Sequence, residues 1–164
     1  VAIPILWHGI RQLDLDGPPG MMLFHNPLLI QWLIEYLRPD LAGEAHLVGI
    51  NQLNPLFMAG WVGLLITGLN MLPISQLDGG HVTYALFLQR SHTIARAFLV
   101  AAIALIVIYE VYIWTMMLIL VILLGTDHPP TADDKVPLGP LRWGIGVASL
   151  AIPILCFPAQ GIRI

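Results

Sequence analysis

The stretch Asn70-Met-Leu-Pro-Ile-Ser-Gln-Leu-Asp-Gly-Gly-His81 decides the fold, because it interrupts an otherwise strongly apolar sequence. Asp78 lies at the end of an apolar run, with Pro73 before it and Gly79 and Gly80 directly after it. An ionisable side chain at membrane depth is costly unless it is paired or bound to a cation, so its default interpretation is functional. Broken backbone at that depth is tolerated only where it lines a protein cavity. The stretch therefore predicts a broken loop that presents a metal-binding carboxylate.

The composition favours an integral membrane protein. The 164 residues are 57% hydrophobic and only 10% charged, with a mean hydropathy of +0.81, whereas soluble domains carry roughly 25% charged residues. The small net charge of -3 argues against a nucleic-acid partner and leaves the lipid bilayer as the expected environment. We expect an all-α, multi-span helical bundle in which residues 1–164 form a single membrane domain.

The segments before the interruption predict two membrane helices and a connection. Residues 1–10 are typical of the end of a membrane helix whose first part is missing, so we expect a C-terminal fragment. Residues 11–53 form a polar, extracytoplasmic connection, in which residues 27–37 predict a helix that is interfacial or covers a pocket. Residues 54–72 predict a span that begins at an Asn-Pro pair and whose glycines allow close approach of a neighbouring helix.

The segments after the interruption contain an ambiguity. We expect a loop at 73–80, a short helix at 81–88, an apolar run at 94–125, a polar loop at 126–142 and a last span at 143–158. The apolar run is interrupted at residues 109–112, so it is either one long tilted helix or a hairpin of two short ones. Basic residues flank both ends of the run, and if both flanks are cytoplasmic the chain must cross and return. We therefore favour the hairpin.

The polar residues of the stretch each allow a structural and a functional interpretation. Asp78 is either a turn aspartate or a functional carboxylate, and its apolar surroundings favour function. Asn70 and Pro73 are suited to ending a helix, and the Asn70 amide is also suited to bonding the backbone of an extended peptide. His81 shares a helical face with Asp78 only if a helix begins at residue 78; we favour a histidine that faces backbone or water.

A zinc hydrolase needs three protein ligands, an open position for water and a nearby general base. The usual compact source of two ligands and the base is His-Glu-x-x-His on one helix. The sequence contains no such motif. The residues alone therefore supply one good candidate ligand, Asp78, and an incomplete site.

The spacing Asn70-x-x-Pro73-x-x-x-Leu77-Asp78-Gly79-Gly80 resembles the site-2 protease family of intramembrane zinc metalloproteases. Residues 54–90, including Trp61-Val-Gly-Leu-Leu65, are similar to the second conserved segment of that family. The tail at 128–139 is similar to that of a bacterial and plastid branch. The resemblance implies that Asp78 is the third zinc ligand and that Asn70 and Pro73 bind the substrate strand or shape the site.

The resemblance also implies a mechanism for a complete protein. Two upstream histidines and Asp78 hold zinc, which lowers the pKa of a bound water, and an upstream glutamate takes its proton. The hydroxide then attacks a peptide carbonyl of an unwound helix in a membrane-anchored protein substrate. The fragment alone is expected to be inactive, and its expected location is a bacterial cytoplasmic membrane. The alternatives are a non-catalytic pseudoprotease or helix-binding membrane protein, and a transporter in which Asp78 carries a proton or cation.

Overall fold

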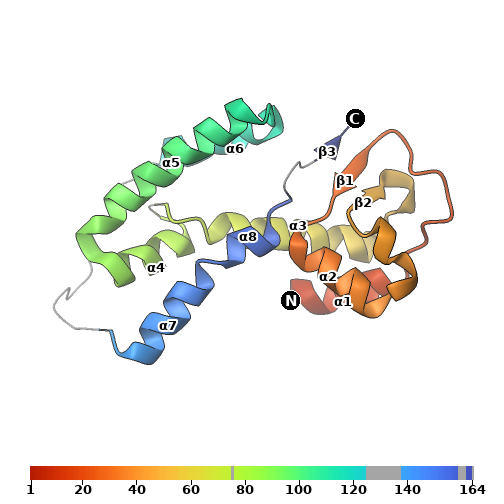
Figure 1. Cartoon of the computed structure of the whole chain (residues 1–164), viewed down its shortest axis with the longest axis horizontal. Coiled ribbons are helices and arrows are strands. Elements are labelled where there is room, and N and C mark those ends of the chain that lie inside the picture. The colour runs from red at the N-terminus through yellow and green to blue at the C-terminus, as the bar shows by residue number, and fades with distance from the viewer. Residues whose placement is uncertain (75, 125–137, 159–161, 164) are drawn as a thin grey trace. The chain divides into compact units, whose positions relative to one another are not determined.

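The computed structural model describes residues 1–74, 76–124, 138–158 and 162–163, and these residues are mostly helical (Figure 1). The chain divides into two compact units, each described here by itself: Val1–Gly68 with Ile154–Ile164, and Leu69–Pro153. The prediction of a single membrane domain stays a prediction.

The first unit combines helices with a small sheet. Its elements are α1 (Ala2–Arg11), β1 (Leu23–His25), α2 (Leu28–Leu37), the 3-10 helix η1 (Pro39–Glu44), β2 (Leu47–Gly49), the 3-10 helix η2 (Ile50–Gln52), β3 (Ile162–Arg163) and most of α3 (Pro55–Asn70). The strand order is β2-β1-β3, and both pairs are antiparallel, with Leu23 opposite Gly49 and Arg163. This sheet corrects the all-α prediction. Strands of two or three residues are too short to produce a readable apolar alternation.

Glycines bring the helices of the first unit close together. A Cβ atom at Gly9 would overlap the backbone of Leu56 and Phe57, and one at Gly60 would lie 2.7 Å from the Leu6 Cβ. The predicted close approach at Gly68 is confirmed, because an added Cβ there would lie 3.0 Å from the Cys156 Cβ. Small residues at such contacts let backbones approach and pack without lipid between them.

The predicted helices of this unit are also confirmed. Asn54 caps α3, since its Oδ1 accepts a hydrogen bond from the Phe57 N–H at 2.8 Å. Helix α2 occupies most of the predicted 27–37 segment and buries Ile30 and Ile34. Across the core, Phe24 of β1 meets Trp61 edge-on at 5.7 Å between ring centroids. The 11–53 segment is thus folded into the unit's core.

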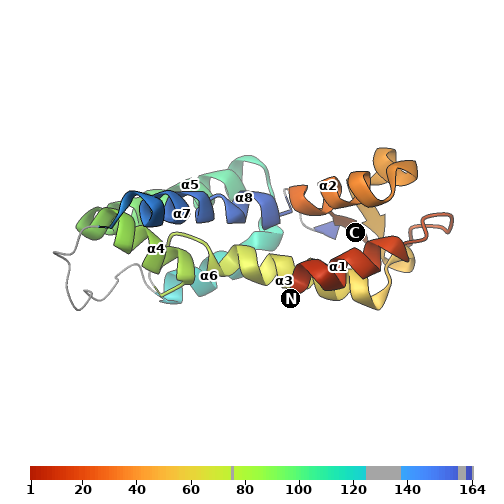
Figure 2. The same ribbon diagram turned by 90° about the horizontal axis from the view of Figure 1, so that it is seen from below.

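The second unit is built from apolar helices. It contains α4 (Asp78–Phe87), the 3-10 helix η3 (Leu88–Arg90), α5 (Ser91–Ile108), the 3-10 helix η4 (Tyr112–Trp114), α6 (Thr115–Leu124) and α7 (Pro140–Ser149). Helix α4 packs on α5 and α7, and α6 turns back from the end of α5 and contacts it (Figures 1 and 2). The hairpin interpretation of residues 94–125 is therefore confirmed.

The predicted last span is interrupted. Helix α7 ends at Ser149 and α8 (Ile152–Cys156) follows after a two-residue break. Pro153 lies in the first turn of α8 and cannot donate a hydrogen bond to the carbonyl one turn earlier, which accounts for the break. Most of the predicted loop at 126–142 lies outside the described residues.

One helical segment in the described part of the chain is long and apolar enough to cross a membrane. It is Asp78–Ile108, with a mean hydropathy of 2.0 over its apolar window. Shorter apolar helices are Leu28–Leu37, Pro55–Asn70, Tyr112–Leu123 and Pro140–Cys156.

Candidate metal centre

The site stretch forms a compact turn between α3 and α4. Helix α3 ends at Asn70, whose side chain is exposed. The Leu72 N–H donates to the Leu69 carbonyl at 3.2 Å, and the Ile74 N–H donates to the Leu72 carbonyl at 2.8 Å. The side chains of Leu72 and Ile74 are buried and Pro73 is half-buried. The turn is thus held by two apolar side chains, with Asn70 presented at its start.

Helix α4 begins at Asp78, three residues earlier than predicted. The sequence interpretation treated Gly79 and Gly80 as helix breakers, yet both are buried in the first turn of α4. A Cβ atom at Gly79 would overlap the carbonyl oxygens of Met71 and Leu72. Gly79 therefore allows the start of α4 to pack directly on the backbone that follows α3.

The Asp78 side chain is exposed in this first turn. Acidic side chains are favoured in the first turn of a helix, because the helix N-terminus carries partial positive charge. The Asp78 carboxylate has no hydrogen bond or ion pair within the part of the chain that the structure describes. It is consequently an accessible anionic oxygen donor. His81 is exposed and lies three residues later on the same helix, so the condition for a shared face is met.

Thr83 was not singled out from the sequence, although it holds the first turn together. Its hydroxyl is buried and donates to the Gly79 carbonyl at 2.7 Å. Next to it, buried Tyr84 contacts the His92 ring of α5 edge-on, at 6.3 Å between centroids. A threonine four residues after a helical glycine is the only sequence signal for this bond, and it is common in helices.

The donor set in the described residues does not complete a zinc site. No group of three or more His, Cys, Asp or Glu side chains that could hold a metal occurs among them. Structural and catalytic zinc sites take at least three protein ligands. Asp78 could therefore be at most one ligand of such a site within the described residues.

The described residues are mostly helical and strongly apolar, and the α3–α4 turn presents the accessible carboxylate of Asp78. Comparison with known families gives its class: residues 33–119 match peptidase family M50, which covers more than half of the chain. The chain therefore belongs to peptidase family M50, the site-2 protease family. This confirms the resemblance found in the sequence.

Several curated plant proteins are similar to the chain. It is 28% identical over 138 residues to "Probable zinc metalloprotease EGY2, chloroplastic" of Arabidopsis thaliana, covering 83% of the chain and 24% of that protein. It is 30% identical over 148 residues to "Probable zinc metalloprotease EGY3, chloroplastic" of Oryza sativa subsp. indica, covering 84% of the chain and 25% of that protein. Over a shorter stretch of 74 residues, 45% of the chain and 13% of the relative, it is 38% identical to "Probable zinc metalloprotease EGY1, chloroplastic" of Arabidopsis thaliana.

The extent of these matches limits which properties of the relatives can be assigned to this chain. The chain spans about a quarter of the length of the first two relatives. All three are named as chloroplastic, so they give no support to the expected bacterial membrane. No solved structure matches the chain.

Proposed function

We propose that the chain is the C-terminal part of an intramembrane zinc metalloprotease that cleaves membrane-anchored proteins. In this proposal Asp78 supplies one zinc ligand, and Asn70 and Pro73 contact or position the substrate strand. The observation that carries it is the α3–α4 turn, in which Gly79 packs on the backbone of Met71 and Leu72 and leaves Asp78 accessible. Family membership and the names of the relatives support the reaction class.

Asp78 suits a metal ligand because of what surrounds it. Zinc accepts carboxylate oxygens, and a ligand must be deprotonated when it binds. The carboxylate is accessible in the first turn of α4. When bound, zinc supplies Lewis-acid polarisation of a carbonyl and a reactive water. This chain's own contribution is to hold the carboxylate at a fixed backbone position.

Asn70 suits substrate contact because it ends α3 and its side chain is exposed. An amide presents one acceptor and two donors, which match the backbone of an extended peptide. A substrate helix has to be unwound before its carbonyls are free to react, and an amide beside the turn stabilises the unwound strand. Pro73 acts indirectly in this proposal, by fixing the backbone of the turn.

We further infer that α6 and α7 complete a multi-span bundle with Asp78–Ile108. Supporting this, α6 exposes Met116, Leu120 and Leu123, and α7 exposes Leu141 and Ile145. Apolar side chains exposed along whole helices are the surface that lipid covers.

The test uses a protein in which this chain follows a His-Glu-x-x-His helix, with cleavage of a single-pass substrate as the readout. Asp78→Asn should lower the cleavage rate by at least about a hundredfold and lower the zinc content measured by mass spectrometry. Glu110→Gln is the matched control, because it neutralises another carboxylate in a turn between apolar helices, and it should change neither quantity.

Asn70→Ala should raise KM for the substrate by up to about tenfold, the effect of one lost hydrogen bond. Its zinc content should stay at the level of the unmodified protein. Full cleavage by Asp78→Asn would overturn the proposal and favour a non-catalytic, helix-binding role.

A further inference from the structure

Aromatic side chains, exposed on α2 and half-buried on α1, form a band along these two helices. Trp32 and Tyr36 are 55% and 75% exposed although both are large and partly apolar. Trp7 of α1 meets Tyr36 at 6.4 Å between ring centroids, which joins the two helices. The Arg11 guanidinium lies 5.8 Å from the centre of the Trp7 ring. We call Trp7, Arg11, Trp32 and Tyr36 the aromatic band.

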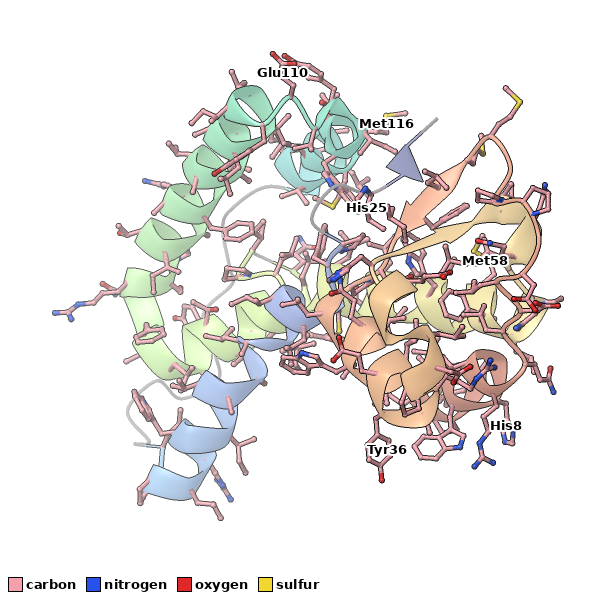
Figure 3. All side chains as sticks on the ribbon, turned by 45° about the vertical axis from the view of Figure 1, so that its right-hand side comes forward. His8, His25, Tyr36, Met58, Glu110 and Met116 are labelled. Carbon is pink, nitrogen blue, oxygen red and sulfur yellow. The ribbon has the colours of Figure 1, made fainter. Side chains whose placement is uncertain are left out.

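The spacing shows that the band is a continuous face. Residues 28, 32 and 36 lie on one side of α2, opposite buried Ile30 and Ile34. Residues 3, 7 and 11 follow one another by one turn along α1, and this row borders the buried side chains of Leu6 and Ile10. Figure 3 shows Tyr36 and His8 pointing away from the ribbon on the same side.

Polarity changes along this face in one direction. Helices α1 and α2 are in contact and run the same way (Figure 2), and the Arg38 Nη1 donates to the Leu13 carbonyl where both end. At their starts, the exposed residues on the face are Ile3 and Leu28.

Charged residues gather at the other end of the two helices. Beyond the aromatic rings lie the acidic side chains Asp14, Asp16 and Asp40, all exposed. Glu35 is also exposed and lies on the same face of α2 as Trp32. The order along the two helices is therefore apolar, then aromatic with single charged residues, then acidic. A membrane–water interface has the same order, and tryptophan and tyrosine are enriched at its headgroup level.

We propose that the aromatic band lies in the headgroup region of a lipid bilayer, with the charged end of both helices in water. This surface is separate from the Asp78 site and does not depend on the proposed reaction. Tryptophan and tyrosine each combine an apolar ring with a polar group, which suits this layer better than a dry protein core. Arg11 suits it too, because its guanidinium lies over the Trp7 ring and, being exposed, can also reach water or phosphate.

The net charge of residues 1–53 predicts which interaction holds the aromatic band at this depth. Residues 1–53 contain two arginines and five acidic side chains, Asp14, Asp16, Glu35, Asp40 and Glu44. A segment with this excess of negative charge is not attracted to an anionic surface. The depth of the band should therefore come from aromatic burial, and it should not increase when anionic lipid is added.

The experiment measures depth with nitroxide labels in the full chain, reconstituted in phosphatidylcholine vesicles, with Cys156 replaced by alanine. Trp32→Cys and Tyr36→Cys carry the label in two separate variants, so that neither result depends on one substitution. Asp16→Cys provides the water reference, and Val100→Cys, on an exposed position in the middle of α5, provides the hydrocarbon reference. The readout is the ratio of collision rates with oxygen and with a water-soluble nickel chelate.

The expected ratio at positions 32 and 36 lies between the two references, and it stays unchanged when phosphatidylglycerol is added. A ratio equal to that at position 16 would overturn the proposal, as would a ratio equal to that at position 100. Protection from both reagents would also overturn it, because another protein segment or a second copy would then cover the band.

Discussion

Two turns of the second unit can be compared, because one forms the candidate site and the other only reverses the direction of the chain. The α3–α4 turn and the α5–α6 turn both join apolar helices, and each carries an accessible carboxylate, Asp78 or Glu110. In the first turn, Leu72 and Ile74 are 4% and 1% exposed. In the second, Tyr109 and Tyr112 are 69% and 61% exposed, and Glu110 lies at the tip of the turn (Figure 3).

The backbones differ as well. At the first turn, Gly79 packs on the carbonyls of Met71 and Leu72 and fixes the start of α4. At the second, Glu110 has a φ of 56°, a left-handed conformation that costs a non-glycine residue about 1–2 kcal/mol. An acid in an apolar sequence is therefore a weak sign of function by itself. The stronger sign is a tightly packed backbone that fixes the position from which the acidic side chain extends.

The largest effect that this comparison predicts is for Gly79→Ala. The added Cβ overlaps backbone atoms, which cannot rotate away, so the free energy of unfolding should fall by about 2–3 kcal/mol. Gly144→Ala is the matched control, because nothing lies within 4 Å of its added Cβ in α7. It should raise the free energy of unfolding by about 0.5–1 kcal/mol through helix propensity. Thermal unfolding in detergent measures both, and equal shifts would contradict the packing argument.

A smaller effect is expected for Thr83→Val, which removes the buried hydrogen bond to the Gly79 carbonyl at nearly constant volume. The free energy of unfolding should fall by about 1 kcal/mol. Thr67→Val offers a close control, because the Thr67 hydroxyl donates to the Gly63 carbonyl at the same 2.7 Å but is exposed. Urea unfolding should show little change for Thr67→Val. A loss of similar size in both variants would mean that burial is not the cause.

The order of the helices could be predicted from the sequence because each is marked by several residues. The Asn-Pro pair at 54–55 marks the start of α3, and the polar interruption at 109–112 marks the α5–α6 turn. The sheet could not be predicted, because β1 pairs with β3 across more than a hundred residues and each strand is very short. Such pairing depends on packing, here of Phe24 on Trp61, which no local pattern reveals.

The motif in the sequence predicted where the candidate site lies, but it did not predict the backbone conformation there. Asn70, Pro73 and Asp78 lie at one turn as expected, and their roles in binding stay predictions. The start of α4 was misplaced because a glycine pair usually ends a helix. Only the contact between Gly79 and the backbone of Met71 and Leu72 explains why the two glycines lie inside a helix in this chain.

Glu110→Gly tests the second turn directly. Glycine removes the cost of the left-handed φ but gains freedom in the unfolded chain, so the free energy of unfolding should rise by about 0.5–1 kcal/mol. Glu110→Ala keeps the backbone cost while it removes the carboxylate, and it should give no such gain. Differential scanning calorimetry in detergent distinguishes the two variants. A gain with alanine would instead mean that the charge, and not the backbone, destabilises this turn.

The smallest effect concerns Asp40. Its carboxylate pairs with Arg38, whereas the carboxylates of Asp78 and Glu110 have no charged partner among the described residues. The Arg38 guanidinium hydrogen-bonds both carboxylate oxygens and holds the pKa of Asp40 below its ordinary value of 3.8. Because the pKa is lower in the folded state, the stabilisation is present above the unfolded pKa and is lost as pH falls through the folded one. The thermal midpoint of the unmodified chain should therefore slightly exceed that of Asp40→Asn at neutral pH, and the difference should vanish in acid. Both side chains reach water, so added salt should also reduce it. A difference in thermal midpoint that persisted at low pH would mean that the introduced amide, and not the loss of the pair with Arg38, lowers the stability. The Asp40 carboxylate would then stabilise the chain no more than the Glu110 carboxylate does.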